Sequence, residues 1–316
     1  MTKKALILSN KKNWRDARPF KSEKFYACYE YFFDLAREKN ILALSASYAW
    51  YDEKRNIFKW AWTFDGKKWD KIKNVRPDII YDKTSFNDEA ELVKNAIFRN
   101  FRIVNDPEFT LLAGHKLFAS LLAPKYFKKY YPVKNSKDIR EALQKIPGSN
   151  LVLKPPLECG GRGVKIMPRK KLISPNLASP MLAQEFIDSS KGIRGILKGI
   201  HDLRVVFVNK KLIYAFVREP ARNSLLANLA QGGTMFYVPE NKLPKSLFPT
   251  IKEIQEVFSF FEPKIYSIDF MFDQKQRPWV VELNTMPGFF FFSNEHKRKQ
   301  KRLFLGIIDV LKKEAV

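Results

Sequence analysis

Two carboxylates and an amide near the C-terminal end of the chain have the spacing of a metal site. Asp269 lies within one apolar run, and Glu282 and Asn284 close the next one. Residues two apart on a strand point to the same face, so Glu282 and Asn284 share a face and Asp269 can lie beside them on the adjacent strand. Such oxygen ligands suit Mg2+, which completes its shell with waters and nucleotide phosphates. The alternative is that one carboxylate points to solvent or pairs with a lysine.

A lysine and a glycine-rich turn form a candidate phosphate site. Lys154 ends an apolar run, and Gly160, Gly161 and Gly163 follow in the turn before the next run. Glycine permits positive φ angles and lets backbone N–H groups approach phosphate oxygens closely. The turn lacks the Gly-Lys-Ser/Thr of a Walker motif, which excludes that class of nucleotide site. Taken alone, the turn also fits an ordinary hairpin.

Two arginines, Arg204 and Arg218, lie on neighbouring predicted strands. A planar guanidinium donates forked hydrogen bonds to a carboxylate or phosphate, which a lysine cannot imitate as well. A surface ion pair with Asp or Glu is the alternative for both. None of the three histidines and neither cysteine, Cys28 or Cys159, lies in a known nucleophile motif. The sequence thus offers no candidate side-chain nucleophile for a covalent step.

Alternating strands and helices should position these residues. In the first part of the chain, short apolar runs predict strands and amphipathic runs predict helices. Strands are expected at residues 4–9, 41–47, 77–81 and 102–104, with a hairpin over 57–72, and helices at 21–39 and 88–99. This alternation predicts a small open α/β unit that ends near Pro107.

Beyond Pro107 the chain is richer in predicted strands. Helices are expected at 109–123, 138–146 and 247–261, and strands at 151–154, 164–167, 181–187, 203–208, 212–217, 267–272 and 279–283. Neither an internal repeat nor a low-complexity linker separates the predicted units, so we expect them to pack together.

The bulk composition predicts a cytoplasmic protein with a basic surface. The 316 residues are 45% hydrophobic, and no run approaches the roughly 20 apolar residues of a membrane span or resembles a signal peptide. Two lone cysteines fit a reducing compartment. The 57 Lys and Arg residues outnumber 33 Asp and Glu residues, for a formal net charge of +24. This charge attracts anions without selecting among them, although solvated helix faces would also explain it.

Together, the order of these motifs resembles the ATP-grasp superfamily over residues 105–292, and within it the glutathione synthetase and RimK-like ligases. The closer likeness is carried by the segments 202–206, 218–220 and 228–233. The resemblance implies an α/β (α+β) ATP-grasp fold, with two α+β subdomains after a small open α/β domain. The implied boundaries are 1–107 for the small domain, 108–183 for the subdomain with the glycine loop and 184–316 for the subdomain with the metal site.

The resemblance also implies a role for each matched residue. The implied nucleotide-binding residues are Lys116, Lys154, Gly160, Gly161, Gly163, Gln184, Glu185, Phe186 and Ile187. The last four form a hinge, in which Glu185 and the backbone of the next two residues read the adenine edge. The implied metal ligands are Asp269, Glu282 and Asn284, and the implied catalytic residues are Arg204, Arg218 and Asn228. The ribose contact, the run Phe289–Phe292 and the basic run His296–Arg302 have no assignment.

The predicted function is ATP-dependent ligation of a carboxylate to an amine, which forms a peptide or amide bond. The reaction would proceed through an acyl phosphate and release ADP and phosphate. The predicted cofactors are ATP and Mg2+, with Mn2+ as the alternative metal. The basic surface favours an acidic peptide or carrier protein as a partner, and a homodimer is the default oligomer.

Two other functions stay open. An ATP-grasp kinase of a polyanionic alcohol, such as an inositol phosphate, would share the chemistry up to phosphoryl transfer and would also suit the net charge. A nucleotide- or nucleic-acid-binding protein without catalysis would draw on the basic charge and the tryptophan-rich hairpin, although no nucleic-acid motif is present. The intact set Lys116, Lys154, Asp269, Glu282 and Asn284 argues against lost catalysis.

Overall fold

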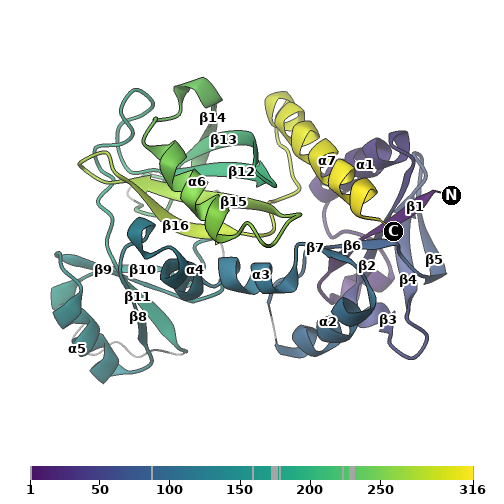
Figure 1. Ribbon diagram of the computed structural model, residues 1–316, viewed down its shortest axis with the longest axis horizontal. Helices are drawn as coiled ribbons and strands as arrows, with labels where there is room; N and C mark the ends of the chain where they lie inside the picture. The colour runs from purple at the N-terminus through teal and green to yellow at the C-terminus, as the bar shows by residue number, and fades with distance from the viewer. Residues whose placement is uncertain are drawn as a thin grey trace. The chain divides into compact units, whose positions relative to one another are not determined.

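The computed structural model describes residues 2–86, 88–158, 160–171, 177, 179–222, 224–227 and 232–315, and it divides into two compact units (Figure 1). The first unit comprises Met1–Pro107, Phe261–Ile265 and Met286–Val316, and the second comprises Glu108–Phe260 and Tyr266–Thr285. The chain after Thr285 thus belongs to the first unit, whereas the sequence division 184–316 joined it to the metal-site subdomain. The boundary between 183 and 184 lies inside the second unit and stays a prediction.

The first unit is built on a seven-stranded sheet in the order β3-β4-β2-β1-β6-β7, with β5 paired to β4. The strands are β1 (Lys3–Ser9), β2 (Ile41–Ser47), β3 (Tyr51–Asp52), β4 (Ile57–Phe64), β5 (Trp69–Val75), β6 (Ile79–Asp82) and β7 (Ile103–Val104). β1 pairs in parallel with β2 and β6, and β4 and β5 form the predicted hairpin. The strands predicted for this part of the chain are therefore confirmed, and β3 is an addition to them.

The helices α1 (Glu23–Glu38), α2 (Asp88–Asn100) and α7 (Asn294–Glu314) belong to the same unit. The sequence predicts α1 and α2 but not α7. The first two inward positions of α7 are polar, His296 and Gln300, so its apolar period begins only at Leu303. The Ser293 hydroxyl accepts a hydrogen bond from the His296 backbone N–H at 3.1 Å and caps the helix.

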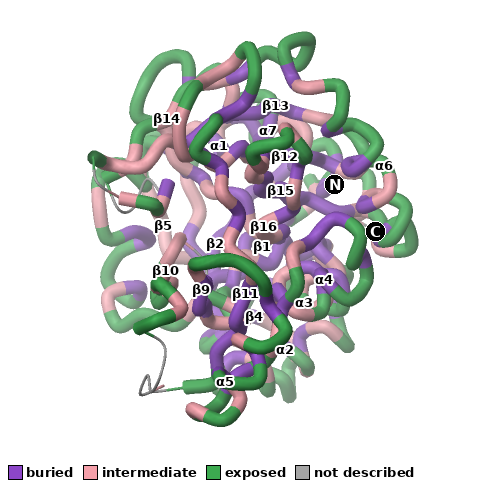
Figure 2. The backbone as a smooth tube through the Cα atoms, turned by 90° about the vertical axis from the view of Figure 1, so that its left-hand side faces the viewer, coloured by how far each residue is buried: buried purple, intermediate pink, exposed green. Residues whose placement is uncertain are grey.

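The phenylalanine run before α7 gives it an anchor. The Phe289 ring is buried, with its centroid 5.1 Å from that of Phe32 on α1 and 4.7 Å from that of Phe304 on α7. Figure 2 shows buried residues concentrated along the strands and exposed residues in the surrounding loops. Aromatic packing thus anchors the segment that leads into α7 within the first unit.

The second unit contains two antiparallel sheets. The four-stranded sheet has the order β10-β9-β11-β8, and the five-stranded sheet has the order β14-β13-β12-β15-β16. Their strands are β8 (Tyr130–Val133), β9 (Asn150–Lys154), β10 (Lys165–Pro168), β11 (Met181–Glu185), β12 (Asp202–Val208), β13 (Lys211–Glu219), β14 (Thr234–Val238), β15 (Ile265–Phe272) and β16 (Pro278–Asn284). β8 and β14 were not predicted, and both lie at sheet edges.

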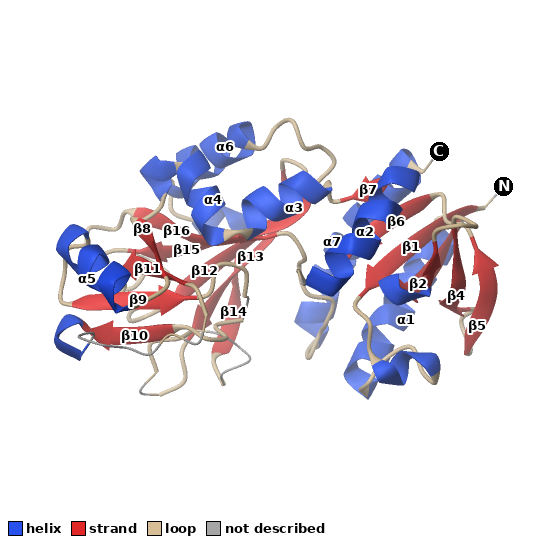
Figure 3. Cartoon of the chain, turned by 90° about the horizontal axis from the view of Figure 1, so that it is seen from below, coloured by secondary structure: helices blue, strands red, loops and turns tan. Residues whose placement is uncertain are grey.

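The helices of the second unit are α3 (Pro107–Gly114), α4 (Lys116–Leu122), α5 (Ser136–Lys145) and α6 (Leu247–Val257). The single helix predicted over 109–123 is split at His115, whose ring nitrogen accepts from the Phe118 backbone N–H at 3.4 Å and caps α4. Seen from below in Figure 3, α5 lies over the four-stranded sheet, and its inward residues share a core with that sheet. Among the described residues, no helix is long and apolar enough to span a membrane.

Candidate active site

A pocket in the second unit is lined by residues of both sheets. The predicted nucleotide residues that line it are Lys116, Lys154, Gly161, Gln184, Glu185, Phe186 and Ile187. Apolar side chains from several strands and loops complete the wall, namely Val152, Val164, Ile166, Leu226 and Met271. A slot with apolar walls and a few polar groups has the character expected of a nucleotide pocket.

Two buried ammonium groups enter this pocket. Lys154, at the end of β9, donates to the Val281 carbonyl at 3.3 Å, and its Nζ lies 4.7 Å from the ring centroid of Tyr130. Burial, followed by the charge of Lys116, lowers the pKa of Lys154 to about 7. Lys116 is the first residue of α4. Its Nζ donates to the Glu158 carbonyl and lies 3.6 Å from Glu282 Oε2. An anion bound here would offset the cost of desolvating both groups.

The glycine turn has the backbone conformation that only glycine adopts easily. Gly160, Gly161 and Gly163 have φ angles of 71°, 74° and 71°. A Cβ at Gly163 would lie 2.8 Å from Pro155 Cγ, whereas a Cβ at Gly160 would meet nothing within 4 Å. Of these glycines, Gly161 alone lines the pocket described above. Gly163 therefore fixes the shape of the turn rather than touching the pocket.

Two side chains of the hinge, Gln184 and Glu185, both line the pocket and differ in their contacts. Gln184 on β11 lies opposite Val152 on β9, so it shares a sheet face with Lys154. Its Nε2 is buried and has no hydrogen-bond partner within the part of the chain that the structure describes. The Glu185 carboxylate accepts from Lys128 Nζ at 2.6 Å. Glu185 thus lines the pocket with its carboxylate already in an ion pair, whereas the amide nitrogen of Gln184 is still available to a ligand; the adenine-reading role of Glu185 stays a prediction.

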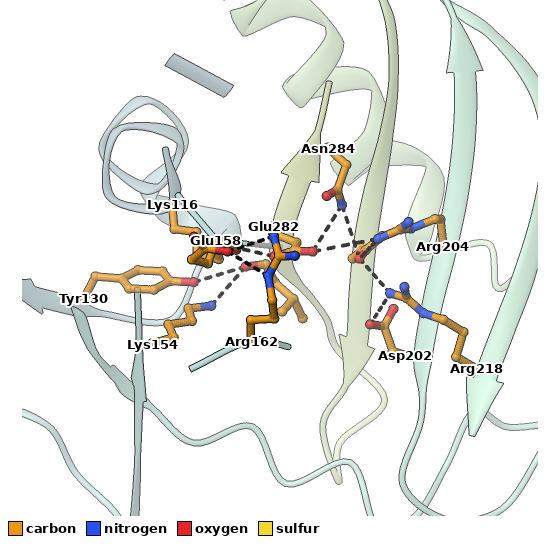
Figure 4. Close-up of polar contacts among 12 residues, drawn as sticks. Lys116, Tyr130, Lys154, Glu158, Arg162, Asp202, Arg204, Arg218, Glu282 and Asn284 are labelled. Carbon is orange, nitrogen blue, oxygen red and sulfur yellow. Dashed lines mark hydrogen bonds and ion pairs between the residues drawn. The ribbon is translucent and has the colours of Figure 1, made fainter. Parts of the chain in front are cut away.

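The three predicted metal ligands lie together on β15 and β16. Asp269 is paired directly with Glu282 in the register of these strands. Asn284 Nδ2 lies 3.2 Å from Glu282 Oε1, as Figure 4 shows for these two labelled side chains, and 3.4 Å from Asp269 Oδ2. A register shift after Asp269 leaves Val281 without a partner on β15, and its carbonyl accepts from Lys154.

The ligand set fits Mg2+. In the described ranges no group of three His, Cys, Asp or Glu side chains could hold a metal, so the two carboxylates depend on the amide as the third protein ligand. Mg2+ needs only one or two carboxylates when phosphate oxygens and waters supply the rest. Asn284 directs its nitrogen at both acids, so its side-chain amide must turn over to offer its oxygen to a metal.

Both predicted catalytic arginines form ion pairs with acids at the site, and among the described residues their ion-pair partners are Asp202, Asp269 and Glu282. Arg204 Nε and Nη2 donate to the two oxygens of Asp269, each at 2.6 Å. Arg218 Nη2 donates to Asp269 Oδ2 at 2.7 Å and also to Asp202 Oδ2. Burial would raise the pKa of Asp269, but Arg204 and Arg218 outweigh it and bring the pKa to about 2.

Asp202 is a site residue that the sequence reasoning missed. It faces Arg218 directly across the β12–β13 pairing, and it lines the pocket. Burial raises its pKa to about 7 against the opposing charge of Arg218. Its position two residues before Arg204, on the same strand face, was the available signal. The remaining predicted catalytic residue, Asn228, lies outside the described residues.

A comparison with protein families finds a RimK-like ATP-grasp domain over residues 128–303. This match covers more than half of the chain, so the chain belongs to the RimK-like ATP-grasp family and is by class an ATP-dependent ligase. Enzymes of this family use ATP and Mg2+ in general. The predicted family and fold class are confirmed. No curated protein matches the chain in sequence.

Several solved structures share the fold over nearly their whole length. D-cycloserine synthetase DcsG aligns with a TM-score of 0.64 at 13% identity, over 97% of this chain and 99% of its own. VanG D-Ala:D-Ser ligase from Enterococcus faecalis aligns with a TM-score of 0.63 at 12% identity, over 100% of each chain. A Chryseobacterium gregarium RiPP-associated ATP-grasp ligase, solved with ADP and a leader and core peptide, aligns with a TM-score of 0.58 at 14% identity, over 99% and 98%. At these identities the likeness shows the fold alone.

Proposed function

We propose that this protein joins a carboxylate to an amine through an acyl phosphate, with release of ADP and phosphate. The observation that carries this proposal is the convergence of Arg204 and Arg218 on Asp269, beside the pocket that holds Lys116 and Lys154. A carboxylate oxygen is a poor leaving group, so it must be activated before an amine can displace it. Positioned cations at a phosphoryl group supply that activation mainly by electrostatics.

The two steps balance without a protein nucleophile. A carboxylate oxygen of the substrate attacks the γ-phosphorus and ADP leaves; the amine then attacks the carbonyl carbon, phosphate leaves and the nitrogen loses a proton. Lys116, Lys154 and the two arginines would hold the phosphate oxygens through both steps. A metal bound by Asp269, Glu282 and Asn284 would neutralise phosphate charge.

For the substrate we propose an acidic peptide or carrier protein. The formal charge of +24 favours acidic partners, and a fold relative was solved with a leader and core peptide. The same charge also supports the second candidate, a kinase of a polyanionic alcohol. In that case the phosphorylated product would be stable and no amine would be required.

The test is ADP release with Mg2+ and ATP against pools of amino acids, dipeptides, acidic peptides and inositol phosphates, followed by mass spectrometry of each responding pool. Ligation gives a product lighter by one water than its two reactants, and a gain of one phosphoryl group would support the kinase instead. Glu282→Gln should lower the rate of ADP release by about 100-fold or more while keeping the fold, because a metal ligand loses its charge. A matched Glu253→Gln on the exposed side of α6 should respond like the wild type.

A further inference from the structure

Asp269 cannot bind a metal in the arrangement described above without losing a partner. Its oxygens accept two hydrogen bonds from Arg204 and one from Arg218, and Asn284 lies within 3.4 Å. Among the described residues, Arg204 has no other acid to pair with if a metal binds. The acids within ion-pair distance of it, Asp269 and Glu282, are both predicted metal ligands. Arg218 differs, because its second acid, Asp202, is not one of them.

Arg218 and Asp202 each have one hydrogen-bonding atom without a partner among the described residues. Arg218 Nε and Asp202 Oδ1 are both buried and have no hydrogen-bond partner in the described part of the chain. The two residues are direct neighbours across β12 and β13, and Arg218 Nη2 already donates to Asp202 Oδ2. A guanidinium offers Nε and one Nη as a fork that matches the two oxygens of a carboxylate. A rotation of the Arg218 side chain that brings Nε to Asp202 Oδ1 would give both unpaired atoms a partner at once.

We propose that Asp202 is a positioning residue that takes up Arg218 in a two-point fork when a metal binds Asp269, an inference that rests on the proposed function. In the metal-free site Arg218 Nη2 is shared between Asp202 and Asp269. In the metal-bound site Arg218 releases Asp269, pairs through Nε and Nη2 with Asp202, and keeps its remaining Nη beside the phosphates. The Arg218 side chain thus has two positions, one shared with Asp269 and one paired only with Asp202. Positions between them are disfavoured, because they would leave buried polar groups without hydrogen bonds.

The test measures Mn2+ affinity in the presence of saturating ADP, by electron paramagnetic resonance of the free metal, and ADP affinity in EDTA. Asp202→Asn replaces an acceptor oxygen with a donor, so the fork cannot form and Arg218 stays on Asp269. The Mn2+ dissociation constant should rise by about 10- to 100-fold, as for other residues that orient metal ligands, whereas the ADP affinity in EDTA should not fall, because the variant removes a negative charge from the pocket. Asp309→Asn, on the exposed side of α7, is the matched control.

Arg218→Lys keeps the positive charge at this position and the negative charge of Asp202. It therefore tests the proposed exchange of partners, which we call the switch, even if Asp202→Asn fails to fold. An ammonium cannot form a two-point fork, so this variant should also lose Mn2+ affinity. Wild-type Mn2+ affinity in either folded variant would overturn this exchange of partners. A loss of ADP affinity in EDTA in Asp202→Asn would also overturn it, because that loss would assign Asp202 to the nucleotide. If the wild-type protein bound neither ADP nor Mn2+, the proposed function would fail and the switch with it.

Discussion

At the scale of single residues, the site is a cluster of charges with a cationic excess. Four cations, namely Lys116, Lys154, Arg204 and Arg218, face three carboxylates, namely Asp202, Asp269 and Glu282. With every group charged, one positive charge is left over before any nucleotide arrives. Such a cluster would bind polyphosphate more readily than an isolated cation.

The pKa of Lys154 predicts how ATP binding depends on pH. In the free protein the pKa is lowered to about 7, and bound phosphates would favour the ammonium and raise it. Above pH 7, ATP binding should therefore take up protons, and ATP affinity should fall as pH rises, by up to about 10-fold per pH unit. Below pH 7 the affinity should level off, because Lys154 is already charged.

Calorimetry at pH 8 in buffers of different ionisation enthalpy measures this proton uptake. Lys154→Ala should bind ATP more weakly and should take up fewer protons. Equal proton uptake in the variant and the wild type would assign the titration to another group, such as Asp202, and would remove Lys154 from the phosphate site.

The paired acids and the conformation of the glycine turn follow from local rules that a sequence displays, namely the period of two on a strand and the φ freedom of glycine. Other site features depend on tertiary contacts. Glu185 is held by Lys128, which lies on a segment with no local relation to the hinge, so the sequence could not show that its carboxylate is engaged. The spacing to Arg204 indicates the strand face of Asp202, but its pairing with Arg218 depends on the register of β12 and β13, which the sequence does not show.

At the scale of elements, the glycine turn offers a matched pair of substitutions. Gly160 and Gly163 share a φ of 71°, but only at Gly163 would a Cβ contact Pro155, at 2.8 Å. Alanine at either position costs about 1–2 kcal/mol for the left-handed conformation, and Gly163→Ala must also displace the turn. We expect kcat/KM for ATP to fall about 10-fold further in Gly163→Ala than in Gly160→Ala. Equal losses would mean that the contact with Pro155 does not shape the turn.

The elements that sequence patterns missed share a physical cause. β8 contains Pro132, which is tolerated because this strand lies at an edge of its sheet. β14 is another edge strand, five residues long, and α7 begins with two polar inward positions. In each case tertiary pairing or packing decides the structure, whereas the short, almost continuous apolar runs of β2, β9 and β15 are visible in the local sequence.

At the scale of the whole molecule, the chain leaves the first unit at Pro107 and returns to it after Thr285. The short segment Phe261–Ile265 in between also belongs to the first unit. The first unit therefore depends on residues from both ends of the sequence. Five of the six tryptophans lie in this unit, and Trp279 lies in the second, so tryptophan fluorescence reports mainly on the first unit.

Phe289→Ala tests this dependence. The ring is buried against Phe32 and Phe304, so its loss should lower the free energy of unfolding of the first unit by about 3–5 kcal/mol. Phe292 is 63% exposed, and Phe292→Ala should change the same quantity by no more than about 0.5 kcal/mol. Urea unfolding followed by tryptophan fluorescence measures both. Similar stabilities for the two variants would contradict the anchoring role of Phe289.

The most direct test of the central claim follows one oxygen atom. The substrate identified by the pooled assay is prepared with 18O in its carboxylate and turned over with Mg2+, ATP and the amine. The acyl-phosphate route predicts that one 18O atom per turnover appears in the inorganic phosphate, because the carboxylate oxygen that attacked phosphorus leaves with it. Unlabelled phosphate, with all 18O retained in the organic product, would contradict the ligase mechanism.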